Sequence, residues 1–247
     1  MIQHHELWLT AFLNQYLSGP ANAFLNAAGH PAADPAHPWR NWMSMLILTI
    51  LLMMVLAALL RPRLSVDKPG KAQLLFESIY GFLRQQSSDV IGHGFEKYVP
   101  MFATFFFFIL IGNLMGIIPG FESPTMYYVV PAGIAMISFA YYNVMGVKAQ
   151  GLVGHLKHFA GPLWWLAWFM FPLEIISHCI RPVSLTIRLY ANMFAGEEVT
   201  LGFLALAPWV VPVVFMGLHA FVSFVQAFIF TLLSMVYVGM AVAHEEH

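Results

Sequence analysis

The chain has 247 residues, of which 60% are hydrophobic and 9% are charged, and its formal net charge is −1. Soluble domains carry about 25% charged residues, so this composition predicts an integral membrane protein. Continuous apolar runs exclude an outer-membrane barrel, whose strands alternate, and the small net charge points to no class of partner. The single cysteine, Cys179, excludes an internal disulfide and is expected to be an inert packed thiol.

The first 40 residues are expected to form an extracytoplasmic segment, and residues 41–247 a single membrane domain. The start, MIQHHE, lacks the basic region and the cleavage site of a secretory signal. Residues 7–16 fit a short amphipathic helix, whereas 21–38 are rich in Ala, Pro, Gly and His and indicate a loop. Four histidines are interpreted as solvated loop residues, with metal binding as the alternative: His4, His5, His30 and His37.

The apolar run 42–60 predicts the first membrane-spanning helix, because its length matches a hydrocarbon core of about 30 Å. The following loop, 61–97, is rich in Lys and Arg. The positive-inside rule therefore places this loop in the cytoplasm and the N-terminus outside. An apolar stripe within it predicts a helix on the cytoplasmic surface at about 70–92.

Two further spans are predicted at 98–118 and 129–147, joined by a short outer loop that contains Glu122 and no Lys or Arg. The first of these spans contains Asn113, which fits either a packing amide or a channel lining. It also contains the pair Gly112 and Gly116, a weak indication of close helix–helix packing.

Two unusually long apolar segments follow, at about 163–205 and 209–243. Upright, the first would be about twice as long as the bilayer core is thick, so it must tilt or bend, and Pro172 and Pro182 are candidate bend points. The expected fold is therefore all-α, with five membrane-crossing helices and one surface helix. The last two helices form a steeply tilted hairpin, and the C-terminus is cytoplasmic.

The first long segment carries a polar line at steps of three and four residues, which places its members on one helical face: Glu174, Ser177, Arg181, Ser184, Arg188 and Asn192. Arg188 matters most, because arginine keeps its charge in proteins. A charge at bilayer depth costs roughly 3 to 17 kcal/mol, so it marks an ion path or a partner.

The second long segment has its own polar line, His219, Ser223 and Gln226. An antiparallel hairpin would pair Glu197 with His219 near the outer side, and Arg188 with Gln226 deeper in the membrane. Such a series of polar pairs is suited to proton movement, since carboxylates and imidazoles exchange protons near neutral pH once their surroundings shift their pKa values. Other interpretations stay open: snorkelling for Glu174 and Arg181, a structural Glu197–His219 pair, packing for His178, and a wet rim for Glu198.

The stretch 181–197, RPVSLTIRLYANMFAGE, resembles the signature of the a subunits of F-type ATP synthases, and 226–237, QAFIFTLLSMVY, is similar to the last helix of that family. The resemblance implies that Arg188 is essential and faces a carboxylate of the rotating c-ring. It implies an outer proton path through Asn192, Glu197, His219 and Gln226 and a cytoplasmic path through Glu174 and Ser177, with weaker indications for Asn113, Ser223 and Arg181.

The same resemblance implies c-ring and b-subunit partners, a bacterial inner-membrane location, no metal or cofactor, and no catalytic chemistry. Two departures concern the outer entrance: Pro124–Tyr128 lacks the acid and amide of many members, and Gly116 stands where an Asp is common. We therefore expect a proton-conducting stator subunit of a rotary ATP synthase. The alternatives are a secondary transporter in which Arg188 binds an anion, and an intramembrane metallohydrolase, for which His244 and His247 have the wrong spacing.

Overall fold

The computed structural model describes residues 6–27, 29, 34–65, 69–118, 120–160, 167–206 and 211–242. In these ranges all regular elements are helical. Three are short 3-10 turns, η1 Arg61–Arg63, η2 Phe95–Lys97 and η3 Pro124–Met126. The others are α1 Trp8–Ala27, α2 Asn41–Leu60, α3 Lys71–Ile91, α4 Val99–Met115, α5 Val129–Ala160, α6 Ala167–Leu206 and α7 Val211–Val242.

Three of the described helices are long and apolar enough to cross a membrane, namely Asn41–Leu60, Val129–Gly151 and Val213–Val242. A shorter apolar helix, Val99–Met115, matches the second predicted span in place but has only 17 residues. The all-helical class is confirmed. Helix α6 is absent from the apolar set, in keeping with the polar and charged residues along its length.

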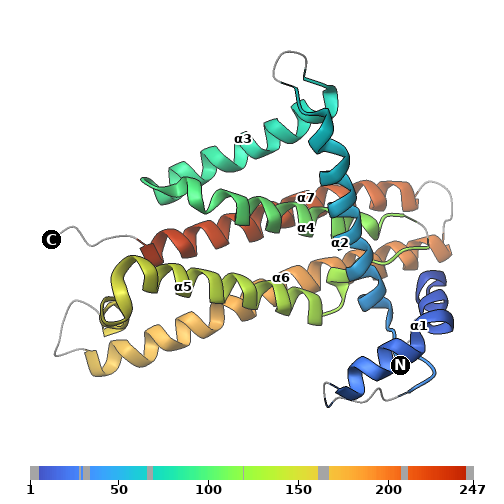
Figure 1. The fold of residues 1–247 in the computed structure, drawn as a ribbon, viewed down its shortest axis with the longest axis horizontal. Helices are drawn as coiled ribbons and strands as arrows, with labels where there is room; N and C mark the ends of the chain where they lie inside the picture. Colours follow the sequence, from blue (N-terminus) through green and yellow to red (C-terminus); the bar gives the residue numbers. More distant parts are fainter. Residues whose placement is uncertain are drawn as a thin grey trace.

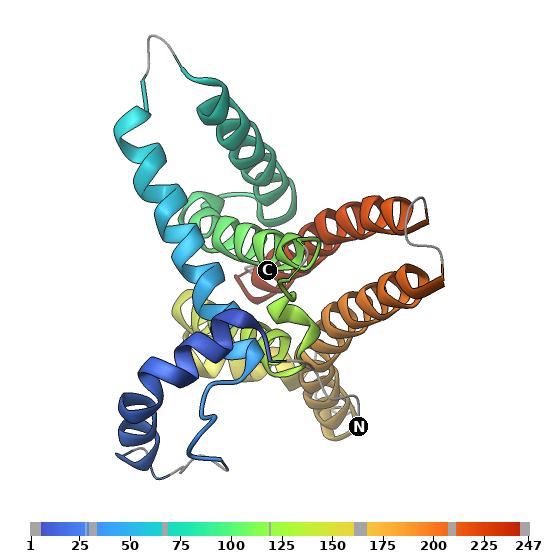
Figure 2. The ribbon, with the colours of Figure 1, turned by 90° about the vertical axis from the view of Figure 1, so that its right-hand side faces the viewer.

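Helices α4, α5, α6 and α7 run side by side, and α2 crosses them steeply (Figure 1). Helix α3 packs on α4 and α7, while α1 packs against α2. Figure 2 shows α6 and α7 as an antiparallel pair whose connected ends project from the rest of the bundle, on the side away from α1. The hairpin predicted at 163–205 and 209–243 is thus present in the parts described.

Aromatic packing holds α4 against α7. The ring of Phe105 meets Phe230 edge-on at 5.8 Å between centroids, and Phe106 meets Phe224 at 5.7 Å. Such pairs contribute about 0.5–1.5 kcal/mol beyond the burial of their surface. The run of phenylalanines in α4 therefore fixes the depth of α7 relative to α4, and with it the depth of the polar line on α7.

The predicted loop at 21–38 is wrong in its first part, because α1 continues to Ala27. The helix is kinked at Leu17 (φ −121°, ψ 16°), so Pro20 falls in the first turn of a new helical piece. Proline is tolerated there, since its missing N–H has no helical partner in any case, and the alanines that follow favour helix.

One other boundary differs from those predicted. Helix α5 runs beyond 147 to Ala160, with a kink at Gly151 (φ +74°), a backbone angle that glycine adopts at little cost. Helix α6 passes through Pro172 and Pro182 as one element. Four residues after the second proline, the Thr186 hydroxyl donates to the Pro182 carbonyl at 2.7 Å, a common side-chain bond to the preceding helical turn.

The glycine pair on α4 does not serve helix–helix packing alone, as the sequence suggested. A Cβ on Gly116 would lie 3.1 Å from the Ser123 Cβ and 3.2 Å from the Ser123 nitrogen. A Cβ on Gly112 would lie 3.3 Å from Pro124 and 3.7 Å from Thr49 of α2. The two glycines thus allow mainly the outer loop to pack against α4, and this contact brings the loop into the membrane domain.

Candidate functional site

The polar line of α6 lies at the edge of its buried face. The buried side of the helix carries His178, Leu185, Leu189 and Met193, and the opposite side carries exposed apolar residues, Ile176, Ile180, Val183 and Ile187. Arg188 is half-buried between the two. The sequence-predicted face is therefore present, and it borders both the interior of the protein and an apolar surface that this chain leaves uncovered.

The guanidinium of Arg188 has no hydrogen bond or ion pair with any residue that the structure describes. The other half-buried arginine of α6, Arg181, does have a carboxylate nearby. A guanidinium offers five N–H donors and keeps its charge, so a counter-charge or water must meet it from outside these residues.

The expected pair of Arg188 and Gln226 is not found. Instead, the Asn192 amide donates to the Gln226 carbonyl oxygen at 3.1 Å. Relative to the expectation, the partner of Gln226 on α6 lies four residues, or about one helical turn, further along the chain. Gln226 itself is 3% exposed, so this bond joins α6 to the interior of the bundle.

The acid and imidazole predicted at the outer end do lie together. Glu197 and His219 line one cavity of about 200 Å³, together with Gly116, Phe121, Thr200 and Met216 among others. A Cβ on Gly196 would lie only 3.0 Å from the His219 Nδ1, so this glycine permits the approach of the ring. The cavity can hold several water molecules, at about 30 Å³ each.

Several buried side-chain polar atoms lack a hydrogen-bond partner among the described residues, and two of them belong to residues that line this cavity. Among them are Glu197 Oε2, His219 Nε2, Asn113 Nδ2 and Ser223 Oγ, and these four come from three helices. Buried polar atoms are nearly always hydrogen-bonded, and several unpaired ones in one region indicate water or a mobile proton. Asn113 and Ser223, weak candidates from the sequence, thus join the outer group.

The outer loop reaches the same group. The Ser123 backbone hydrogen-bonds Glu197, and Thr125 Oγ1 donates to Asn113 Oδ1 at 2.5 Å. Ser123 can lie there because Gly116 has no side chain. The glycine that replaces a common Asp of the resembling family therefore has a packing role, and the loop takes part in the site although it lacks that family's acid and amide.

Sequence reasoning missed the role of Glu122 in this loop. Its Oε2 accepts hydrogen bonds from the Tyr127 hydroxyl at 2.5 Å and from the Asn41 amide at 3.3 Å, and it lies close enough to Glu197 for the two charges to interact. Burial, followed by the hydrogen bond to Glu122, raises the pKa of Tyr127 far above its usual value. The sequence feature that could have indicated this role is that Glu122 is the sole acidic residue of the outer loop.

At the other end of α6, the side chains of Glu174, His178 and Arg181 form a second group. Glu174 Oε1 lies 3.3 Å from His178 Nδ1 and 3.9 Å from Arg181 Nη2. The Arg181 guanidinium stacks over the rings of Tyr237 at 5.0 Å and Tyr142 at 6.0 Å. Arg181 therefore packs between α5, α6 and α7, and does not snorkel from a helix end.

Ser177 does not join that packed group, since it lies on the exposed face of α6. Cys179 is also exposed, so the expected packed thiol is wrong. His37 pairs with Glu6 at 3.4 Å, and no cluster suited to a metal occurs among the described residues. His4, His5, His30, His244 and His247 lie outside them.

Comparison with known proteins identifies the family of the chain. A family described as ATP synthase A chain matches residues 42–239, a range that contains Glu174, Arg188, Glu197 and His219. The chain belongs to this family. It is 54% identical over 232 residues to ATP synthase subunit a of Solibacter usitatus, covering 94% of this chain and 99% of the relative. It is 48% identical over 240 residues to that of Koribacter versatilis, covering 97% and 98%.

A more distant relative, ATP synthase subunit a of Sulfurimonas denitrificans, is 40% identical over 207 residues, which is 83% of this chain and 92% of the relative. The chain is therefore a multi-pass membrane protein and a subunit of an F-type ATP synthase. Within that complex it is the stator subunit that provides the proton channel, and it has no catalytic chemistry of its own. The resemblance found in the sequence is thereby confirmed.

Proposed function

We propose that this chain forms two separate proton half-channels that lead to and from a carboxylate on the c-ring, with Arg188 between them. The observation that carries the proposal is the place of Arg188. It is a half-buried cation without a described internal partner, and it borders the exposed apolar stripe of α6. A ring of helices that carries carboxylates at the same depth would both cover that stripe and supply the missing counter-charge.

The outer half-channel consists of Glu197, His219, Asn192 and Gln226, with Asn113 and Ser223 as further lining. Its support is the cavity beside Glu197 and His219 and the unpaired polar atoms of the outer group. From there, the Asn192–Gln226 bond leads along the hairpin towards Arg188. A proton that enters from outside moves along this line and protonates the ring carboxylate.

Arg188 acts as the separator because it cannot release a proton and because its charge repels protons that approach. Its positive charge also favours the ionised form of a carboxylate brought close to it. A ring acid that arrives protonated therefore releases its proton before it passes Arg188. This release occurs into the cytoplasmic half-channel, for which Glu174 and Ser177 are the proposed lining, with Arg181 holding Glu174.

The remaining assignments follow from family membership together with the charge pattern. The protein lies in the bacterial inner membrane and crosses it five times, with α3 on the cytoplasmic surface, residues 1–40 outside and the C-terminus inside. Residues 41–247 form one membrane domain. The c-ring subunits contact the exposed faces of α6 and α7, and the b subunits of the peripheral stalk hold the chain in place.

The test compares proton flux in vesicles that carry the whole complex with wild-type chain or with Arg188→Ala. We expect the variant to lose ATP-driven pumping but to retain passive conduction once the soluble head is removed. Arg84→Ala is the matched control, because Arg84 pairs with Glu96 at 2.8 Å on an exposed surface. Normal pumping by the Arg188 variant would refute the two-channel mechanism, and loss of pumping in the control would show a general effect of lost positive charge.

A further inference from the structure

The outer loop has a carboxylate that no part of the proposed mechanism uses. Glu122 is held by two donors from different elements, the Tyr127 hydroxyl at 2.5 Å and the Asn41 amide at 3.3 Å. Asn41 is the first residue of α2, and its Oδ1 accepts from the Leu7 backbone at 3.3 Å. A half-buried acid held this firmly is placed by the fold, unlike a solvated loop residue that is free to turn.

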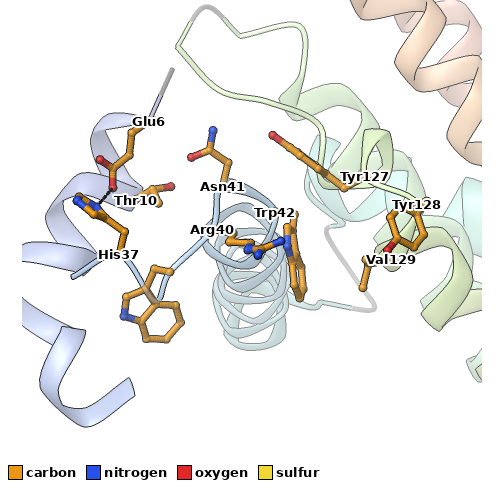
Figure 3. A pocket seen from close by; sticks show the side chains of 10 residues that line it. Glu6, Thr10, His37, Arg40, Asn41, Trp42, Tyr127, Tyr128 and Val129 are labelled. Atoms are coloured by element: carbon orange, nitrogen blue, oxygen red, sulfur yellow. Dashed lines mark hydrogen bonds and ion pairs between the residues drawn. The ribbon is translucent and has the colours of Figure 1, made fainter. Parts of the chain in front are cut away.

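Two of the groups that contact Glu122 belong to a second, larger cavity. Asn41 and Tyr127 line a space of about 550 Å³ on the N-terminal side of the protein, as do Glu6, His37 and Arg40. Figure 3 shows Glu6 and His37 on one side of this space, Tyr127 and Tyr128 on the other, and Arg40 and Asn41 between them. It is an open chamber, formed mainly by residues that precede the membrane domain and by the outer loop, and ionisable side chains stand among the aromatic ones on its walls.

The residue before Glu122 faces the other cavity. Phe121 lines the 200 Å³ space that contains Glu197 and His219. Phe121 also meets the ring of Trp8 edge-on at 6.1 Å, which ties α1 to the outer loop. Glu122 therefore lies between the two cavities. The residue before it, Phe121, lines the inner cavity, and the two residues that bind its carboxylate, Asn41 and Tyr127, line the outer chamber. Its charge also interacts with that of Glu197.

We infer that Glu122 is the entrance acid of the outer half-channel, which takes protons from the N-terminal chamber and passes them to Glu197. In this arrangement residues 6–42 are part of the proton path, because they build the outer chamber and, through Asn41, hold the entrance carboxylate. The inference rests on the proposed function, since it extends the outer half-channel by one proton-exchanging group.

The transfer balances with water as the only other participant. A hydronium ion in the outer chamber gives a proton to the Glu122 carboxylate. The acid then releases that proton to water in the inner cavity, which protonates Glu197. Other ionisable groups face this step: Tyr127 in the loop, Glu198 on α6, His219 on α7, and Glu6, His37 and Arg40 around the chamber. Tyr127 stays protonated and serves as a donor, so it fixes the acid without competing for the proton.

The experiment measures ATP synthesis by the whole complex in proteoliposomes, with the outer entrance facing the lumen and the total driving force held constant. At a lumen pH of about 8, where protons are scarce, we expect Glu122→Gln to lower the rate roughly tenfold, because capture by a positioned acid is lost. At a lumen pH of about 6 the variant should approach wild type. Glutamine keeps an oxygen acceptor for Tyr127 and Asn41, so the loop retains its support.

Two controls separate an exchanging role from a structural one. Glu122→Asp keeps the acid and should remain within about twofold of wild type at both pH values. A second variant, Glu122→Cys in a Cys179→Ser background, should regain activity at high lumen pH after reaction with a carboxylate-bearing methanethiosulfonate but not with a sulfonate-bearing or a neutral one. A Gln defect that is equal at both pH values, or an Asp variant as impaired as Gln, would overturn the inference.

The outcome is distinguishable from a failure of the proposed function. If Arg188→Ala abolishes pumping while Glu122→Gln matches wild type at both pH values, the two-channel mechanism stands and the entrance acid is wrong. If Arg188→Ala pumps normally, the proposed function itself is wrong, whatever the Glu122 variants show.

Discussion

The two ends of α6 both contain a glutamate near a histidine, but the surroundings of these side chains differ. At the outer end, Glu197 and His219 border a cavity and each has a buried polar atom without a described partner. At the other end, Glu174 lies against His178 and Arg181, and two tyrosine rings cover the guanidinium. An acid and a histidine thus border a cavity at one end, whereas at the other end an acid and a histidine lie against a cation and aromatic rings.

This difference shows that residue type alone does not assign a role in proton transfer. Groups that exchange protons need room for water and unused hydrogen-bonding capacity, whereas groups that support a fold have their capacity filled. Substitutions in the outer group are therefore expected to lower proton flux, whereas substitution of Arg181, which holds Glu174 at the inner end, is expected mainly to lower stability. Four predictions test this division, ordered from the largest expected effect to the smallest.

The largest effect is expected from Glu197→Gln, which removes the ionisable group of the open end. Loss of a positioned acid typically costs 10²- to 10⁴-fold, and we expect ATP-driven pumping per assembled complex to fall by about 100-fold. Glu198→Gln is the matched control, since it removes the neighbouring acid, and it should change pumping less than about twofold. Equal losses in both variants would mean that local charge, and not the position of Glu197, controls the flux.

A smaller loss is expected from Gly196→Ala, which adds a methyl group 3.0 Å from the His219 Nδ1. The ring must shift, and we expect flux to fall roughly tenfold without loss of assembly, because alanine favours helix over glycine. Gly202→Ala on the same helix meets no atom within 4 Å and should only stabilise the helix slightly. If both variants pumped alike, the close approach of His219 to α6 would not matter.

At the packed end, Arg181→Ala should lower stability rather than conduction. It removes two cation–π contacts and the contact with Glu174, together worth about 1–3 kcal/mol. Thermal unfolding of the purified complex and proton flux per assembled complex would separate the two effects. Arg181→Lys keeps the charge but not the planar stacking, so partial recovery of stability is expected. A loss of flux at unchanged stability would give Arg181 a conducting role beyond holding Glu174.

The smallest effect concerns Tyr127, which joins the outer loop to the open end. Burial and the bond to Glu122 raise its pKa in the folded protein above the unfolded value of about 10. The neutral form is thus favoured by folding, and the resulting stability is complete below pH 10 and declines as the pH rises above it. Tyr127→Phe should lack this alkaline decline. Unfolding temperatures of both forms between about pH 9 and 11 would show it, and identical slopes would contradict it.

Much of the site was accessible from the sequence because helical periodicity is a local property. Steps of three and four residues place Arg188 and Asn192 on one face of α6, and His219, Ser223 and Gln226 on one face of α7, before any contact is known. The pairing of Glu197 with His219 also followed from a simple antiparallel hairpin. The pairing of Arg188 with Gln226 did not hold, since an error of one turn is enough to exchange Arg188 for Asn192.

The outer entrance could not be predicted in the same way, because its members are far apart in the chain. Asn41 begins α2, Glu122 and Tyr127 lie in a loop about 80 residues later, and Glu197 lies on α6. Their meeting depends on Gly112 and Gly116, which let the loop settle onto α4. In the sequence this glycine pair indicated helix–helix packing. Two glycines on one helical face show that some part of the chain approaches closely, but they do not show which part.

The sequence by itself determined that this is an all-helical membrane protein with a charged residue it cannot neutralise, and its motif determined the family. Those properties reside in composition, periodicity and a short stretch around Arg188. Only the tertiary structure decided which polar groups stay open to water and which are closed by packing. Hydration of a buried group depends on the volume left by residues remote in sequence, and that volume exists only once α4, α6, α7 and the outer loop have packed together.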